Sequence, residues 1–156
     1  MSIPQSGGGP IEHHEQLAQY LADGCKPKTD WRIGTEHEKF GYCKDTLQPL
    51  PFEGERSIEA VLAALRDRHG WAELREGGKL TGLEKDGANV SLEPGGALEL
   101  SGAPLESIHE TCDEVNQHLR EVMDIANEIG VSFIGLGAAP TWTHAQMPLM
   151  PKGRYK

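Results

Sequence analysis

Apolar and polar residues alternate strictly on both sides of a Pro-Gly-Gly sequence in the middle of the chain. This period of two is typical of strands that bury one face. A turn over residues 94–96 would bring the apolar side chains together in two cross-strand pairs. These pairs are Val90 with Leu100 and Leu92 with Leu98. A turn displaced by one residue would place each leucine opposite a polar residue, so the pattern predicts a hairpin of defined register.

Glutamates occupy the other face of this hairpin and one face of an earlier predicted strand. Glu93 and Glu99 would be diagonal neighbours in the hairpin, ~7–8 Å apart at the backbone. Glu36 and Glu38 lie in a strand predicted over residues 31–42, and side chains two residues apart share a strand face. Close like charges raise each other's pKa unless a cation lies between them. The pattern indicates either a site for a divalent ion such as Mg²⁺, which prefers carboxylate oxygens, or a solvated polar face.

Three segments have the apolar spacing of helices. They are residues 11–23, ending at Gly24; a segment capped by Ser57 and ending at Gly70; and residues 105–129, with a capping box at Ser107–Glu110 and an end at Gly130. Short strands joined by glycine turns are predicted over residues 71–87, and a further strand over residues 131–137. An antiparallel hairpin with a long helix on its apolar face indicates an α+β fold.

The sequence also predicts the environment of several individual side chains. Cys112 lies in the apolar row of the long helix and is expected to be buried. His109 and His118 do not share a face of that helix and are expected at the surface. His37 points away from the face of its glutamate neighbours, so it is expected to pack or to be exposed rather than to bind metal. Trp142 follows a proline and either lines a pocket or anchors the tail.

Charge and composition narrow the class of partner. The chain has 15 Lys and Arg against 24 Asp and Glu, a net charge of −9. Nucleic acid and anionic membranes reward clustered positive charge, so neither is expected as a partner. Residues 1–14 have no basic segment followed by an apolar run, and no apolar stretch is long enough to span a membrane. With three cysteines in no metal-type spacing, the chain is expected to be cytoplasmic with reduced thiols, and its oligomeric state is not predicted.

Three motifs carry a family resemblance. They are IGTEHEKFG at residues 33–41, SLEPGGALELSGAPL at residues 91–105 and PKGRY at residues 151–155. In this order they resemble glutamate–cysteine ligase, in its branch of plants and proteobacteria. The resemblance implies a curved antiparallel sheet with helices on its outer face, similar to glutamine synthetase, and an active site on the concave face.

The same resemblance predicts the organisation of the chain. Family members are much longer, so residues 31–156 are expected to be the N-terminal part of one catalytic domain. Residues 1–30 are expected to form a lead-in and a helix. The tail from residue 138 has no periodicity and ends in a polar loop, which also indicates a truncated chain.

The resemblance further implies an ATP-dependent ligase. The expected reaction joins the γ-carboxylate of glutamate to the amine of cysteine through a γ-glutamyl phosphate, the first step of glutathione biosynthesis. The implied cofactors are ATP and Mg²⁺, and the implied partners are the small molecules glutamate, cysteine and ATP. By motif position, the resemblance implies catalytic roles for Glu36, Glu38 and Glu93. The same three residues and Glu99 are the implied metal ligands. The implied residues of substrate or nucleotide binding are Gly34, Gly95, Gly96 and Arg154.

Two alternatives stay open at this point. The acceptor amine could differ from cysteine, because no residue visibly recognises a thiol. The chain could also be a non-catalytic module that exposes half of a sheet and associates through its unpaired edge. Under the ligase interpretation, this chain alone is expected to be inactive, since ligands from later strands are missing.

Overall fold

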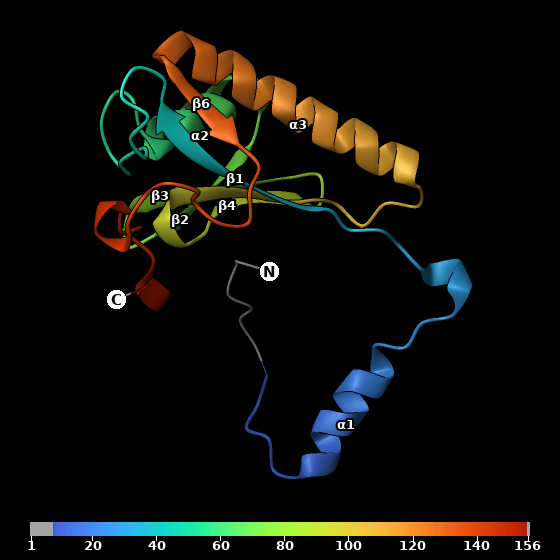
Figure 1. The fold of residues 1–156 in the computed structure, drawn as a ribbon. Coiled ribbons are helices and arrows are strands. Elements are labelled where there is room, and N and C mark those ends of the chain that lie inside the picture. The colour runs from blue at the N-terminus through green and yellow to red at the C-terminus, as the bar shows by residue number, and fades with distance from the viewer. Residues whose placement is uncertain (1–7, 156) are drawn as a thin grey trace.

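An antiparallel sheet forms the centre of the molecule. The computed structural model describes residues 8–155, and within them the sheet has six strands in the order β2-β3-β4-β5-β1-β6 (Figure 1). Every neighbouring pair of strands is antiparallel. The strands are β1 (Glu36–Cys43), β2 (Ala72–Glu76), β3 (Lys79–Lys85), β4 (Ala88–Leu92), β5 (Ala97–Ser101) and β6 (Val131–Ile134). The predicted α+β class and the antiparallel sheet are confirmed.

The β4–β5 hairpin has the register that the sequence predicts. Its apolar pairs are Val90 with Leu100 and Leu92 with Leu98, and all four side chains are at most 1% exposed. The turn requires glycine, because Gly95 and Gly96 have φ angles of 74° and 80°. A Cβ atom on Gly95 would also overlap the side chain of Met147. Turn geometry and buried leucines therefore select the same register.

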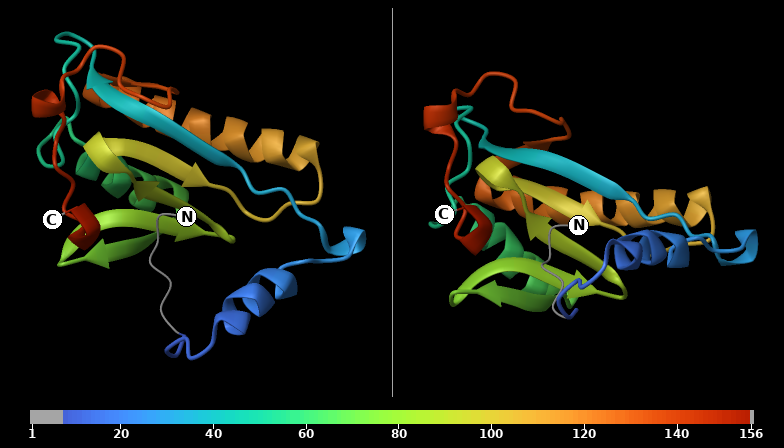
Figure 2. Two further views of the ribbon diagram at one scale, coloured as in Figure 1. Left: turned by 60° about the horizontal axis from the view of Figure 1, so that its bottom comes forward. Right: turned by 90° about the horizontal axis from the view of Figure 1, so that it is seen from below.

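Two helices, α2 (Ile58–His69) and α3 (Ile108–Ile129), cover the face of the sheet that carries these leucines (Figure 2). Both begin at the serine caps that the sequence predicts and end at glycines in the left-handed conformation. The core between helices and sheet includes Val61, Leu62, Leu65, Leu83, Leu98, Val122 and Ile125. Burying each such side chain contributes about 1.5–3 kcal/mol, so this face supplies most of the stability. Among the described helices, none combines the length and the apolar content needed to cross a membrane.

Strand β1 begins at Glu36, later than the predicted start at Trp31. The segment before it still approaches the chain beyond β5, through an isolated bridge between Ile33 and Leu105. Pro104 lies between that bridge and the β1–β5 ladder, and proline has no backbone N–H to donate. The ladder is interrupted there, so the first part of the predicted strand remains outside the sheet.

The buried row of α3 (Ile108–Ile129) differs from the predicted row in its first half. Cys112 is exposed and Ile108 is 64% exposed, whereas His118 is only 2% exposed. Val122 and Ala126 are buried as their spacing predicts, but the other buried positions are shifted around the helix and include Thr111, His118 and Ile125. His118 packs edge-on against Trp71, with ring centroids 6.4 Å apart. The predictions of a buried Cys112 and a surface His118 are wrong, because both rows carry apolar residues and tertiary packing decides between them.

Helix α1 (His14–Asp23) lies away from the sheet (Figure 1). Its apolar side chains Leu17, Tyr20 and Leu21 are 52%, 80% and 73% exposed. It ends before Gly24 as predicted, but it does not cover the outer face of the sheet as α2 and α3 do. The division into residues 1–30 and 31–156 stays a prediction, and residues 1–7 lie outside the described part of the chain.

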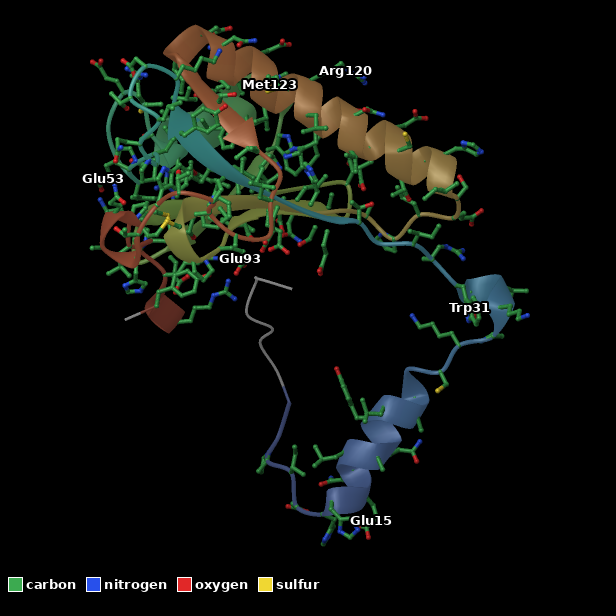
Figure 3. All side chains as sticks on the ribbon, viewed as in Figure 1. Glu15, Trp31, Glu53, Glu93, Arg120 and Met123 are labelled. Atoms are coloured by element: carbon green, nitrogen blue, oxygen red, sulfur yellow. The ribbon has the colours of Figure 1, made fainter. Side chains whose placement is uncertain are left out.

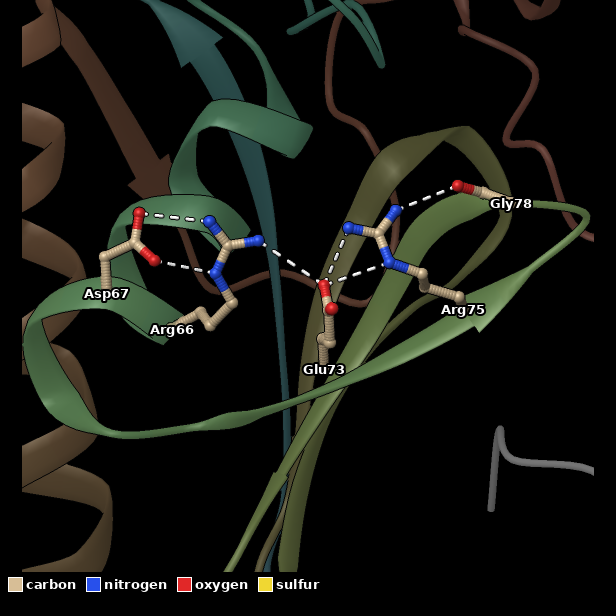
Figure 4. A network of polar contacts seen from close by, with 5 residues as sticks. All are labelled: Arg66, Asp67, Glu73, Arg75 and Gly78. Atoms are coloured by element: carbon tan, nitrogen blue, oxygen red, sulfur yellow. Dashed lines mark hydrogen bonds and ion pairs between the residues drawn. The ribbon is translucent and has the colours of Figure 1, made fainter.

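Charged side chains link α2 to strand β2 at the surface (Figure 4). Arg66 donates to Asp67 at 2.7 Å and to Glu73 at 3.4 Å. Arg75 donates to Glu73 at 3.0 Å and to the Gly78 carbonyl at 2.9 Å. Exposed pairs of this kind contribute ~0–1 kcal/mol each. The hydrophobic core, rather than this network, therefore holds α2 against the sheet.

Candidate functional site

Glutamates from two strands meet on the face of the sheet opposite α2 and α3. Glu38 in β1 is directly opposite Glu99 in β5, and Glu36 is opposite Ser101. Directly opposed residues have Cβ atoms ~4.5–5.5 Å apart, and residues two apart in one strand share a face. The pairing of β1 with β5 therefore brings together carboxylates that are 61 residues apart in the sequence, at positions 38 and 99.

Glu99 occupies the most enclosed position of this group. It is 5% exposed, and the hydroxyl of Ser91 in β4 donates to its Oε2 atom at 3.4 Å. Lys39, on the helix-facing side of β1, is 1% exposed and its Nζ lies 3.4 Å from the Leu98 carbonyl oxygen. Burial lowers the pKa of Lys39 to about 7, although the charge of Glu99 acts in the opposite direction. A buried lysine with a lowered pKa therefore lies behind the acidic face.

Glu93 lies at the turn end of the hairpin, on the same side of the sheet. Its N–H donates to the Ala97 carbonyl at 2.8 Å, which makes it the diagonal neighbour of Glu99 as predicted. Its carboxylate accepts from Arg154 Nη2 at 2.7 Å and from the Tyr155 hydroxyl at 3.2 Å. Figure 3 shows Glu93 on the opposite side of the sheet from Arg120 and Met123 of α3. Two predicted site residues, Glu93 and Arg154, are thus joined in one ion pair.

The C-terminal tail supplies further groups to this site. Lys152 is 4% exposed and its Nζ donates to the Leu92 carbonyl at 2.9 Å. Burial and the neighbouring Arg154 lower the pKa of Lys152, against the effect of nearby carboxylates. Trp142 donates its indole N–H to the Leu47 carbonyl at 2.9 Å and packs edge-on against Phe40. Of its two predicted roles, Trp142 therefore has that of an anchor for the tail.

Sequence reasoning missed Lys39, Lys152 and Tyr155 as members of this site. All three lie inside the motifs that carried the resemblance, which was the available signal. Lysine is almost never fully buried without a partner, so composition alone favours an exposed position for both lysines.

An open hollow of about 490 Å³ lies over the β1–β5 glutamates. Its lining includes Glu36, Glu38 and Glu99, together with Gly135 and Leu136 after β6. In the described chain, no three or more Asp, Glu, His or Cys side chains converge closely enough to hold a metal ion by themselves. Mg²⁺ is usually held by one or two carboxylates together with water and substrate phosphates. The opposed pair Glu38 and Glu99 fits that requirement.

The three predicted glycines have different surroundings. Gly34 is exposed, and a Cβ atom there would meet no atom within 4 Å. Gly95 and Gly96 lie beneath the side chains of Met147 and Met150. The turn thus accounts for glycine at positions 95 and 96, while the structure contains no steric reason for glycine at 34. Their predicted role in substrate binding stays a prediction.

Comparison with known proteins gives a consistent result. A model of glutamate-cysteine ligase family 2 (GCS2) matches residues 32–156. The chain is 49% identical over 142 residues to glutamate–cysteine ligase A, chloroplastic, of Oryza sativa subsp. japonica, covering 91% of this chain and 28% of that protein. It is 50% identical over 141 residues to the chloroplastic glutamate–cysteine ligase of Brassica juncea, covering 90% and 27%. The chain therefore spans little more than a quarter of the length of these relatives.

The expected cytoplasmic location is contradicted by these comparisons. The relatives from Oryza sativa, Brassica juncea and Arabidopsis thaliana are named chloroplastic enzymes. The expectation rested on three cysteines expected to be reduced, in a sequence without a secretory leader, and neither feature bears on a plastid transit peptide, which is rich in Ser and Arg. A secretory signal and a plastid transit peptide are physically different segments. The absence of a secretory signal therefore gives no information about a transit peptide.

The resemblance that the three motifs indicate is thus confirmed by a match across the whole sheet and the C-terminal tail. The chain belongs to glutamate-cysteine ligase family 2.

Proposed function

We propose that this chain forms part of the catalytic domain of a glutamate–cysteine ligase. The enzyme would use ATP and Mg²⁺ to join the γ-carboxylate of L-glutamate to the amine of L-cysteine, the first step of glutathione biosynthesis. The observation that carries the proposal is the cross-strand pair Glu38 and Glu99, with Glu36 on the same face. The glutamine-synthetase-like form of the complete sheet is part of the same proposal.

The reaction needs an activated carboxylate, because a free carboxylate is a poor electrophile. An oxygen of the γ-carboxylate attacks the terminal phosphorus of ATP, and ADP leaves. The cysteine nitrogen then attacks the acyl carbon of γ-glutamyl phosphate, inorganic phosphate leaves, and the nitrogen loses a proton. Phosphoryl transfer depends mainly on positioning and on neutralising phosphate charge.

The residues of the acidic face have separate roles in this scheme. Glu38 and Glu99 would hold Mg²⁺ through their carboxylate oxygens, with Glu36 beside them on the same face, and the ion would neutralise the phosphate oxygens of ATP. Glu93 would complete this set once Arg154 turns from it toward an anionic substrate group. The ion pair between Glu93 and Arg154, at 2.7 Å, keeps the guanidinium at the edge of the site.

ADP release tests the proposal. The assay uses glutamate with cysteine, and glutamate with α-aminobutyrate, on a chain of the relatives' length that carries these 156 residues. Turnover with cysteine supports the ligase, turnover only with another amine selects the different acceptor, and no turnover overturns the proposal. We expect the 156-residue chain alone to release no ADP above background.

Substitutions identify the carboxylates that matter. Glu38→Gln and Glu99→Gln keep the side-chain shape and remove the charge, and each is expected to lower turnover at least about a hundredfold, within the range for a lost electrostatic contact. Glu84→Gln is the matched control, because Glu84 is exposed on the same sheet face and lies on strand β3, beyond β4 and β5 from Glu36. Full turnover in Glu38→Gln would remove the metal role of that residue.

A further inference from the structure

A second polar cavity lies on the other side of the sheet, between α3 and strands β3 to β5. Its volume is about 310 Å³, at the small end of the range for small-molecule sites. Five carboxylates line it, with Lys85 as the cation of the wall: Asp86, Glu110, Asp113, Glu114 and Glu121. Lys85 Nζ donates to the His69 carbonyl at 2.7 Å. The cavity is therefore strongly negative and is separate from the Glu38–Glu99 site.

His118 points to a ligand in this cavity. The side chain lines the cavity and is 2% exposed, yet neither ring nitrogen has a hydrogen-bond partner among the described residues. Burial, with smaller effects from Lys39 and His37, lowers the pKa of His118 to about 3, so the ring is neutral at pH 7. A neutral imidazole offers one acceptor and one donor. A buried polar group without partners lowers stability and calls for an explanation such as a bound molecule.

Glu114 provides a second incomplete polar group. Its Oε1 atom accepts the Ala103 N–H at 2.8 Å, whereas its buried Oε2 atom has no partner in the described chain. The carboxylate lies over Gly102, where a Cβ atom would overlap it. Because Gly102 has no side chain, the Glu114 carboxylate fits above it. The Ala103 N–H holds its Oε1 atom, and its Oε2 atom is left as an acceptor without a partner among the described residues.

The lining selects the kind of ligand. Trp71, Leu100 and Leu105 supply apolar surface, and the Trp71 ring already lies 5.9 Å from one ammonium group, that of Lys85. Hard ions such as Mg²⁺ prefer oxygen ligands to an imidazole nitrogen, and no three side chains among the described residues could hold an ion such as Zn²⁺ that accepts imidazole. An alkyl ammonium group instead satisfies single, separated acceptors with its N–H donors.

We propose that the cavity between α3 and the sheet binds a small organic ammonium ion, with Glu114 and His118 as its hydrogen-bond acceptors and Trp71 beside its alkyl part. This inference rests on the cavity and not on the proposed ligase reaction, so either can fail without the other.

Tryptophan indole N–H signals in NMR spectra of the 156-residue chain provide the test, with the diamine putrescine as the probe. The Trp71 signal is expected to move and to saturate, because its indole N–H donates to Glu121 at 3.2 Å at the cavity wall. The signals of Trp31 and Trp142, which lie elsewhere, are expected to stay in place. The neutral butane diol of the same length is expected to move none of them.

Two substitutions on α3 separate the site from general charge attraction. Glu114→Gln retains the Oε1 acceptor for Ala103 and removes the charge, and it is expected to weaken putrescine binding at least about tenfold. Asp124→Asn makes the same charge change at an exposed position of the helix and is expected to alter binding less than about twofold. His118→Phe preserves the aromatic ring beside Trp71 and is expected to weaken binding without unfolding the protein.

Three results would overturn the inference. One is a Trp71 signal that does not move at about 10 mM putrescine, where a millimolar site would be nearly saturated. Another is equal weakening by Glu114→Gln and Asp124→Asn, with both proteins folded by their NMR spectra. The third is equal binding of the diamine and the neutral diol.

Discussion

The two faces of the central sheet differ in what they contribute. The face toward α2 and α3 carries Val90, Leu98 and Leu100, all at most 1% exposed. The opposite face carries Glu36, Glu38 and Glu99 beneath an open hollow. Alternation along each strand therefore places residues of opposite character next to each other in sequence and on separate faces in space. A substitution in one of these strands is therefore expected to lower either the stability of the protein or its ligand binding, depending on which of two adjacent residues is changed.

The comparison is not a simple division into apolar and polar. Lys39 and His118 are buried among the apolar side chains, and Phe40 packs against Trp142 on the acidic side. These exceptions occur where the chain has a second layer to cover them: α3 on one face and the C-terminal tail on the other. The predictions below test whether the faces are as independent as the register implies.

The largest expected effect is on the helix-facing side. Leu98→Ala removes a fully buried side chain and is expected to lower the free energy of unfolding by about 2–5 kcal/mol. Urea denaturation measures this value. Glu38→Gln, on the other face and in the adjacent strand, is the matched change; a loss of equal size there would contradict the assignment of stability to one face.

The next effect depends on pH and concerns His118. Its pKa is about 3 in the folded state, against an ordinary value of 6.5. As the pH falls below that ordinary value, the unfolded chain takes up a proton at this residue and the folded chain does not. The free energy of unfolding should therefore decrease with falling pH by up to about 1.4 kcal/mol per unit from this group.

His118→Phe isolates that contribution, because other titrating groups remain in place. Denaturation curves at several pH values between the two pKa values should show a shallower decline for the variant than for the parent protein. Parallel curves for the two proteins would show that His118 is hydrated or partnered in the folded state.

On the acidic face, a substitution is expected to raise the free energy of unfolding by a smaller amount. Glu38→Gln removes one of two like charges that face each other across β1 and β5, so the metal-free protein should become more stable by about 0.2–1 kcal/mol. Added Mg²⁺ with ATP should stabilise the parent more than the variant. A destabilised variant in the absence of metal would mean that the Glu38 carboxylate has a structural partner.

The smallest effect is expected outside both faces, in α1. Leu21 is 73% exposed, and Leu21→Ser should change the free energy of unfolding by no more than about 0.5 kcal/mol. Thermal or urea unfolding measures it. A loss of several times this size would show that α1 packs against another surface in solution.

The sequence predicts some parts of this fold well for physical reasons. The hairpin is specified locally, because four alternating apolar residues and a three-residue glycine turn agree on one register. The caps at Ser57 and Ser107 are equally local, since each hydroxyl bonds an N–H three residues later. Nothing local specifies which row of α3 faces the sheet, and there the prediction for Cys112 and His118 fails.

The candidate site also has parts that follow from local sequence and parts that depend on tertiary contacts. Alternation places Glu36 with Glu38, and Glu93 near Glu99, but only the β1–β5 pairing puts Glu38 opposite Glu99. The burial of Lys39 and Lys152 and the contact of Arg154 with Glu93 depend on residues far apart in the chain. The motif resemblance named Glu93 and Arg154 but not their contact, and it did not single out Lys39 or Lys152.

Paramagnetic broadening by Mn²⁺, used as a probe for the divalent site, tests the central claim most directly. The account predicts that Mn²⁺ with ATP broadens the backbone amide signals of residues 38 and 99 together, and that Glu38→Gln reduces the broadening at residue 99 on the facing strand. Glu84, on the same face but beyond β4 and β5, should show little broadening. Unchanged broadening at residue 99 in Glu38→Gln, or equal broadening at Glu84, would contradict a shared ion between β1 and β5.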